Sequence, residues 1–458
     1  MNDITAFFAF LKYCLGYKEN MSRVIAGMNW HELYSFASKQ ALLGLCFEGI
    51  ERLGEEYPEE LKRNPIGREL LMTWMGKAQQ IRRQNMKVNA VASKLFSMLR
   101  EDGMRCCILK GQGNALMYPN PYSRIPGDID VWIDASRERI MEYAQKKFEL
   151  EDDIRLQHLE TSLDGVPVEL HFFPCSMNNP IYHARLQKWF RRNADLQCSH
   201  IVGLPDGAGD IAIPTTAFNV VYQLTHLYHH FFDEGIGMRQ IIDYFLVVND
   251  FSKNVFLNND LSNHPVNFSN HPVPLSKEGS TFSPSPSSSG SGDVTAPSRC
   301  SEPLRSKDGG PSKVSPDCAG WDRLAIEGDN SAGSTTVVTS SASTALVVVQ
   351  RELKYLGLWK FAGAVMYVLH EALGLSEEKM IAPMDEKRGK LLLAEILNGG
   401  NFGKHFTKYG HFTQQGMAKK YFLKIWRNMH FVRYFPAEAL SEPIFRTWHF
   451  FWRLKHRR

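Results

Sequence analysis

The apolar residues in the first part of the chain recur at helical spacing. Residues 29–53 place Leu33, Phe36 and Leu43 three and seven positions apart, so these side chains share one face of a helix. The stretch that follows keeps the same pattern up to a glycine that can end a helix. The pattern therefore predicts an N-terminal helical region over residues 1–95.

After residue 95, short apolar runs alternate with amphipathic stretches. Three segments have the composition of strands: residues 104–109, 128–134 and 156–174. The last of them is divided by Asp164-Gly165, a dipeptide typical of tight hairpin turns. Helical segments follow the first and the second strand. The order strand, helix, strand, helix, hairpin predicts a small α/β core over residues 96–205.

Helical spacing returns in residues 206–250 and 346–458, which predict a C-terminal helical region. Between them, residues 251–345 are rich in Ser, Pro, Gly and Asn, and the sequence SNHPV occurs twice, starting at Ser262 and Ser269. Such a composition buries too little apolar surface to offset its ordering entropy. We predict a disordered insertion there, tolerated as a surface loop rather than kept as a regulatory tether.

The fold class expected from these patterns is α+β, with a small mixed sheet and helices flanked by N- and C-terminal helical regions. The 458 residues are enough for two or three domains, and 43% of them are hydrophobic, as in globular proteins. The net charge of +4 excludes neither nucleic acid nor small acidic substrates. The eight cysteines include no CxxC pair and predict buried, reduced thiols.

The sequence shows no targeting or membrane segment. The N-terminal apolar stretch is short, lacks a basic leader and is broken by Lys12, which argues against a signal peptide. No run of about eighteen apolar residues is present that could span a bilayer. These features predict a cytoplasmic protein.

The strongest chemical signal is the sequence GDIDVWID, in which Asp128 and Asp130 are two positions apart. On a strand, residues at this spacing point to the same face. Two carboxylates held close together repel each other, which raises their affinity for protons or cations. Because Mg²⁺ prefers carboxylate oxygens, the pair predicts a magnesium site; two surface acids on an edge strand are the plainer alternative.

Glu169, in the alternating run GVPVELHFF, is the expected third carboxylate from a neighbouring strand. With Asp128 and Asp130 it would hold two Mg²⁺ ions, and Mn²⁺ would suit the same oxygens. Such a pair of ions can activate an attacking oxygen and stabilise a leaving phosphate. His171 shares the strand face of Glu169 and is a further candidate for the site.

The turn LKGQGNALMY is the expected phosphate site. Backbone N–H groups at a Gly-rich helix start can bind phosphate, Gly111 allows close approach, and Lys110 adds a positive charge. Arg124 precedes the acidic strand. It has two possible roles, either binding a phosphate or pairing with Asp128 to hold the loop.

The succession ILKGQGNALMYPNPYSRIPGDIDVWID, followed by VPVELHF, resembles a family of largely uncharacterised bacterial nucleotidyltransferases within the polymerase-β-like superfamily. The matching positions are Lys110, Gly111, Tyr118, Arg124, Asp128, Asp130 and Glu169. The segments DYFLVVN, LGLWKFAGAVMYVL and GGNFGKH are also similar to family members, some of them encoded beside surface-polysaccharide genes. The resemblance covers most of the chain outside the insertion.

This resemblance implies that three carboxylates bind Mg²⁺ while a nucleoside monophosphate, for example from ATP, is moved onto an acceptor. The sequence departs from the wider superfamily at the helix start, where Lys-Gly-Gln-Gly replaces the usual Gly-Ser or Gly-Gly. The phosphate contacts or the donor could therefore differ. The acceptor is left open, because fold alone does not settle function.

A few other residues are candidates for the site. His226 and His230 would share a helix face, but without a HExxH motif we favour partly buried histidines over a metal site. Together with Arg239 and Asp243 they could line a cleft and contact base or acceptor. The basic, aromatic C-terminus could bind nucleic acid or an anionic membrane. We favour a terminal helical pair whose aromatics pack inward while its Arg and Lys face water.

The function expected is nucleotidyl transfer from a nucleoside triphosphate to an unknown acceptor. One alternative is a non-catalytic scaffold for surface-polysaccharide assembly, against which the three intact acids argue. Another is a toxin–antitoxin or defence component that modifies a protein or tRNA. A hydrolase with opposed carboxylates is disfavoured, because two acids on one strand suit metal ions better.

Overall fold

The structure is a computed structural model that describes residues 3–150, 155–256, 342–405 and 417–456. One compact unit comprises residues 1–267 and 331–458, and a second, residues 268–330, lies outside the described ranges. Most of the predicted insertion is likewise outside them. Its flanks are helical as far as Phe256 on one side and from Ala342 on the other, so the helices extend further towards it than we predicted.

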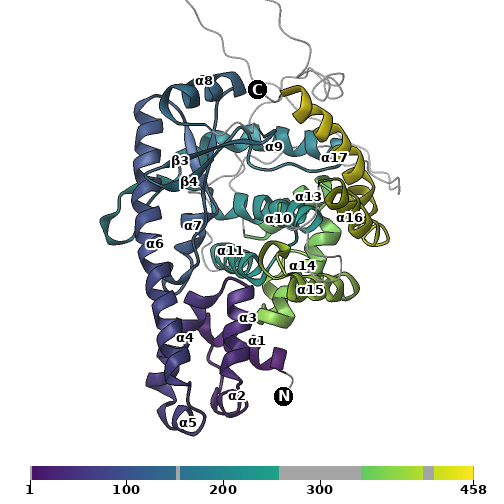
Figure 1. The fold of residues 1–458 in the computed structure, drawn as a ribbon. Helices are drawn as coiled ribbons and strands as arrows, with labels where there is room; N and C mark the ends of the chain where they lie inside the picture. Colours follow the sequence, from purple (N-terminus) through teal and green to yellow (C-terminus); the bar gives the residue numbers. More distant parts are fainter. Residues whose placement is uncertain (1–2, 151–154, 257–341, 406–416, 457–458) are drawn as a thin grey trace, which may run out of the picture. The chain divides into compact units, whose positions relative to one another are not determined.

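The N-terminal region is helical, as the spacing predicted. It contains α1 (Asp3–Cys14), α2 (Ser22–Ala26), α3 (Trp30–Lys39), α4 (Leu43–Glu56), α5 (Pro58–Arg63) and α6 (Arg68–Glu101). Helix α6 runs from these helices to the sheet (Figure 1) and ends at Glu101, just before Gly103, the glycine expected to end it. It thereby joins the N-terminal helices to the α/β core.

A four-stranded mixed sheet forms the centre of the core, which confirms the α+β class. It is built from β1 (Cys106–Leu109), β2 (Ile129–Ile133), β3 (His158–Leu163) and β4 (Val166–His171). The strand order is β1-β2-β4-β3. Strands β2 and β4 pair in parallel, and the other two pairs are antiparallel. Helices α7 (Gly111–Ala115) and α8 (Arg137–Lys147) connect the strands in the predicted order.

The predicted hairpin joins β3 to β4. Its two turn residues, Asp164 and Gly165, have φ angles of 51° and 70°, as a two-residue turn with the twist of the sheet requires. A smaller hairpin follows α9 (Pro180–Ser199) and consists of β5 (Ile201–Gly203) and β6 (Asp210–Ala212).

The remaining described chain is helical. It comprises α10 (Thr216–Asp233), α11 (Met238–Phe256), α13 (Ala342–Tyr355), α14 (Trp359–Leu373), α15 (Glu386–Gly399), α16 (Met417–Met429) and α17 (Pro436–His456). The loop predicted near Gly235 and Gly237 separates α10 from α11. None of the helices within the described ranges is both long and apolar enough to cross a membrane.

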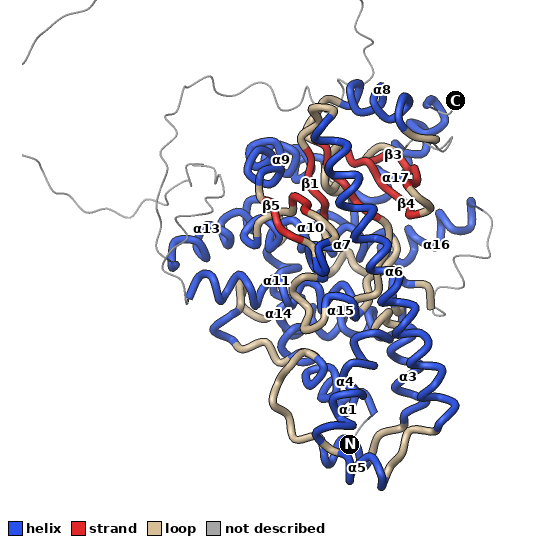
Figure 2. The backbone as a smooth tube through the Cα atoms, turned by 90° about the vertical axis from the view of Figure 1, so that its left-hand side faces the viewer, coloured by secondary structure: helices blue, strands red, loops and turns tan. Residues whose placement is uncertain are grey.

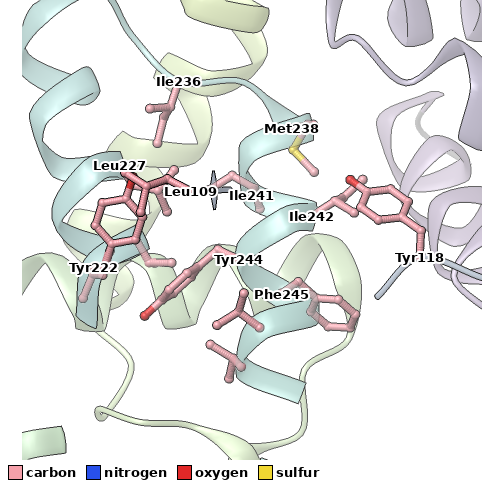
Figure 3. Packing of buried hydrophobic residues seen from close by; sticks show 14 of the residues in the cluster. Leu109, Tyr118, Tyr222, Leu227, Ile236, Met238, Ile241, Ile242, Tyr244 and Phe245 are labelled. Carbon is pink, nitrogen blue, oxygen red and sulfur yellow. The ribbon is translucent and has the colours of Figure 1, made fainter. Parts of the chain in front are cut away.

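The sheet lies between α6 on one side and α9 with α10 on the other (Figure 2). Trp132 of β2 stacks on Phe218 of α10, with ring centroids 6.1 Å apart. Buried side chains of α10 and α11, including Tyr222 and Ile241, pack with Leu109 of β1 (Figure 3). Because alternate residues of a strand share a face, Asp130 points to the same side as Trp132, towards the helical region.

The close packing of α4 against the loop that leads to the acidic strand gives a test of the fold. A Cβ atom on Gly44 would lie 2.2 Å from the carbonyl oxygen of Ser123, whereas one on Gly54 of the same helix would meet nothing within 4 Å. We predict that Gly44→Ala lowers the free energy of unfolding by about 1–3 kcal/mol through overpacking. Gly54→Ala should leave it unchanged or raise it by up to about 1 kcal/mol. Urea unfolding of both variants measures the difference, and equal stabilities would contradict the described packing.

Candidate active site

The register of the sheet brings the predicted acids together. Asp130 of β2 is paired with Glu169 of the parallel strand β4 and with Leu109 of β1. Asp128 stands one residue before β2 begins. Lys110 follows β1 directly and so lies beside Asp130. The juxtaposition expected from the sequence is therefore present, while the roles of these residues stay predictions.

The carboxylate of Asp130 is buried between two nitrogen groups. Lys110 Nζ donates a hydrogen bond to its Oδ1 over 3.1 Å, and His171 Nε2 lies 3.0 Å from the same oxygen. Burial by itself would raise the pKa of Asp130. The Lys110 charge and His171 outweigh burial and hold that pKa below its usual value. Asp130 is thus ionised at neutral pH.

Asp128 has the opposite electrostatic environment. The neighbouring charge of Asp130, followed by burial and by Glu169, raises the pKa of Asp128 to about 6. The two aspartates therefore titrate far apart, as expected for carboxylates that share a site. Additional positive charge at this place would relieve their repulsion.

The imidazole ring of His171 contacts both Asp130 and Glu169. Its Nε2 lies 3.0 Å from Asp130 Oδ1 and 3.0 Å from Glu169 Oε2. Burial opposes its protonation, but these two contacts raise the pKa of His171 to about 9. The site role predicted for His171 is thus supported by its contacts. His158, whose Nδ1 is 3.3 Å from Glu169 Oε2, was missed. Its alignment with His171 across the hairpin could have identified it.

The turn after β1 places Lys110 at the mouth of the site. Its φ angle is 52°, followed by 26° at Gly111. A positive φ is uncommon for a residue with a side chain, and such conformations cluster at functional sites. Lys110 Nζ is also 3.2 Å from His226 Nε2 of α10. Burial and the Lys110 charge lower the pKa of His226 well below its usual value, so its ring is neutral and can accept this hydrogen bond.

Arg124 is an internal ion-pair residue that also reaches the pocket. It is only 5% exposed, and its Nε and Nη2 donate to the two carboxylate oxygens of Asp243 over 2.8 Å each. Tyr118 donates to the same carboxylate over 2.8 Å. Of the alternatives for Arg124, loop fixation is present, but the partner is Asp243 of α11 and not Asp128. Phosphate binding by Arg124 stays a prediction.

A pocket opens between the acidic strand and helices α10 and α11. It is partly open to solvent, and the space between its walls is about 540 Å³. The residues that line it include the predicted site residues other than Glu169, together with members of the helical region: Lys110, Gly111, Asn114, Arg124, Gly127, Asp128, Asp130, Gln223, His226, Leu227, Arg239, Gln240, Asp243 and Phe402. His226, Arg239 and Asp243 line this pocket as expected, whereas His230 is not among its lining residues.

Two side chains on the helical wall of this pocket each have one nitrogen atom without a hydrogen-bond partner. Arg239 and Gln240 are each 8% exposed, and Arg239 Nε and Gln240 Nε2 have no hydrogen-bond partner. The guanidinium of Arg239 lies 5.6 Å from the ring centroid of Phe402, which has a φ angle of 53°. Because buried donors are normally satisfied, these groups are suited to acceptor atoms of a ligand.

The metal site considered for His226 and His230 is not supported by the geometry. Their rings stack edge to face, with centroids 4.3 Å apart, and burial lowers the pKa of both. Within the described ranges, the residues whose ligand atoms all lie within 4.8 Å of one another are His158, Glu169 and His171. The two helix histidines are partly buried residues, as favoured from the sequence.

The C-terminal helices differ in part from the expected pair. Phe431 and Phe435 pack into the core as expected. Arg427, however, is 1% exposed and donates to the Phe231 carbonyl over 2.8 Å, so it does not face water. Several apolar side chains of α16 and α17 are exposed instead, among them Phe422, Trp426, Phe450 and Phe451.

The Asp243 ion pair yields a stability prediction. Asp243→Ala would leave the Arg124 guanidinium buried without its partner, and removing one member of a buried pair costs about 3–5 kcal/mol. Lys94→Ala, which removes the half-exposed partner of Asp164, should cost less than about 1 kcal/mol. Chemical unfolding compares the two variants, and a small effect of Asp243→Ala would show that the pair is not needed.

The acid pair yields a titration prediction. In the metal-free protein, a ¹³C signal from the Asp128 carboxyl should titrate near pH 6. Asp130→Asn removes the largest cause of that shift, so the pKa of Asp128 should fall towards the usual value for aspartate, about 3.9. An unchanged titration in the variant would mean that the two carboxylates do not interact.

Comparison with known proteins places this site in a family. A family model described as an uncharacterised nucleotidyltransferase matches residues 26–262, which include the whole acidic site and both helices that line the pocket. No curated protein and no solved structure matches the chain significantly. The match covers more than half of the sequence, and the chain belongs to this uncharacterised nucleotidyltransferase family.

Proposed function

We propose that the protein transfers a nucleoside monophosphate from a nucleoside triphosphate to an acceptor in a Mg²⁺-dependent reaction. The observation that carries the proposal is the set of three acids, with Asp130 and Glu169 in register on adjacent strands and Asp128 and Asp130 lining one pocket with Lys110. Membership of the nucleotidyltransferase family supports the same reaction class.

The residues fit Mg²⁺ by their chemistry. Carboxylate oxygens are its preferred protein ligands, and the raised pKa of Asp128 reflects negative charge that a cation would offset. Asp128, Asp130 and Glu169 would hold the ions. When bound, Mg²⁺ would neutralise triphosphate charge and favour departure of pyrophosphate.

Lys110 would be the main cationic contact for the triphosphate from the chain itself. In the described state its ammonium is engaged by Asp130. If a bound cation balances the charge of Asp130, the ammonium of Lys110 can donate a hydrogen bond to a phosphate oxygen instead, as Lys does in other phosphate sites. His226, a neutral acceptor beside Nζ, keeps the ammonium at the pocket wall.

The helical wall would bind the rest of the nucleotide. The unpartnered donors of Arg239 and Gln240 would meet acceptor atoms of the phosphates or the base. Phe402, which lines the same pocket, offers an aromatic face on which a base can stack. Gln223 and Asn114 also line this pocket, and their side chains form two hydrogen bonds with each other.

The reaction itself would be a displacement at the α-phosphorus. An acceptor oxygen forms a bond to that phosphorus, the bond to the bridging oxygen breaks, and pyrophosphate leaves. Glu169, whose side chain is 20% exposed, would receive the proton of the acceptor hydroxyl. Positioning and charge compensation would supply most of the rate enhancement.

Turnover tests this proposal. Purified protein is incubated with each α-labelled nucleoside triphosphate and Mg²⁺, with and without cell extract that supplies acceptors. Asp130→Asn and Lys110→Met should reduce label transfer by at least about a hundredfold, the usual effect of removing one group that stabilises charge in a transition state. Asp164→Asn, in the exposed hairpin turn, should retain full activity.

The control outcomes separate the alternatives. Label transfer that survives Asp130→Asn would contradict the assigned site. Absence of both transfer and Mg²⁺-dependent nucleotide binding would favour the scaffold alternative. Label on tRNA or on a partner protein would favour the defence alternative and identify the acceptor class.

A further inference from the structure

A second group of side chains that can bind a metal ion lies on the hairpin β3–β4 and shares Glu169 with the acidic site. His158, Glu169 and His171 present ligand atoms that all lie within 4.8 Å of one another. Glu169 Oε2 is 3.3 Å from His158 Nδ1 and 3.0 Å from His171 Nε2. Two imidazoles and one carboxylate form a donor set different from the three carboxylates proposed for Mg²⁺.

The hairpin register creates this group. His158 of β3 is paired with His171 of β4, and Glu160 with Glu169. Paired residues of an antiparallel ladder point to the same face, and Glu169 is two positions before His171 on its strand. The three ligands therefore come from two adjacent strands of one rigid hairpin, which is a precise support for a metal site.

The distances within the group fit a bound ion. Ligands about 2.0–2.1 Å from a tetrahedral Zn²⁺ ion are about 3.3 Å from one another. The two contacts of Glu169 Oε2, at 3.3 Å and 3.0 Å, are close to that separation. Asp130 Oδ1 lies 3.0 Å from His171 Nε2, next to the group but outside the set of three ligands.

His158 is the observation that points most directly to a ligand. It is 9% exposed, and neither of its ring nitrogens makes a hydrogen bond. A buried polar group without a partner is costly, and an ion at Nδ1 would remove that cost. Its Nε2 lies 3.6 Å from the carboxylate of Glu160, beyond hydrogen-bond distance.

Two neighbouring contacts complete the surroundings of the group. His158 also lines a second pocket together with Gln157, Ser176 and His229. Gln157 lies beside the other histidine as well, with its Nε2 3.3 Å from Nδ1 of His171.

We propose that His158, Glu169 and His171 bind one divalent transition-metal ion, with Zn²⁺ the best fit to two imidazoles and one carboxylate. The ion would take the place of the hydrogen bonds that His171 makes to the two acids. It would also anchor Glu169 through Oε2. The proposal does not depend on nucleotidyl transfer, since it concerns metal binding alone.

Spectroscopic titration tests the site. The full-length protein is stripped with a chelator and titrated with Co²⁺, which reports tetrahedral imidazole coordination by visible absorption, and the complex is then challenged with Zn²⁺. We expect one equivalent of Co²⁺ to give the tetrahedral absorption and Zn²⁺ to abolish it. His158→Asn should weaken binding at least about tenfold, on the scale seen when even an outer partner of a metal ligand is lost.

Matched variants make the result specific. His31→Asn, on the exposed face of α3, should bind Co²⁺ like the wild type. As a second readout, Zn²⁺ should raise the melting temperature of the wild-type protein more than that of His158→Asn, because binding to the folded state stabilises it. Absence of Co²⁺ absorption and of the Zn²⁺-dependent melting shift, or full binding by His158→Asn, would overturn the proposal.

The outcome is independent of the transfer assay. Nucleotidyl transfer without transition-metal binding would refute this inference and leave the proposed function intact. Co²⁺ binding without transfer would support the inference and count against the proposed function.

Discussion

The buried negative charge of Asp130 has to be balanced by groups from separate parts of the chain. Lys110 approaches from the end of β1 and His171 from β4, both within 3.1 Å of the same carboxylate oxygen. An ionised carboxylate without such partners would be strongly destabilising in a buried position. The parallel pairing of β2 with β4 and the tight turn after β1 are therefore electrostatic requirements as well as features of the sheet.

The same constraint explains the role of the helical region. Helix α10 supplies His226 beside Lys110, and α11 supplies Asp243 for the Arg124 guanidinium. The loop that enters the acidic strand is thus fixed from outside the sheet. The family match, which extends through both helices, agrees with a pocket that needs the sheet and the helices together.

Much of the fold and part of the site could be read from local patterns. Period-two alternation placed Asp130 and Glu169 on strands, and Asp164-Gly165 marked the hairpin. The partner of Arg124 could not be found in this way, because Asp243 is 119 positions away and the contact depends on how α11 packs. His158 was missed for a related reason. Its place in the site depends on its pairing with His171 across the hairpin, and that register cannot be read from one strand alone. Local periodicity indicates which face of a helix or strand a residue occupies, whereas its partner in an ion pair depends on tertiary packing.

A crystal structure with Mn²⁺ and a nonhydrolysable nucleoside triphosphate analogue would test the proposed active site, because anomalous scattering locates the ions. Manganese should contact Asp128 and Asp130, and the triphosphate should lie beside Lys110 and Gly111 within the pocket bounded by α10 and α11. A nucleotide bound elsewhere, or a pocket with neither ion nor triphosphate at saturating concentrations, would contradict it.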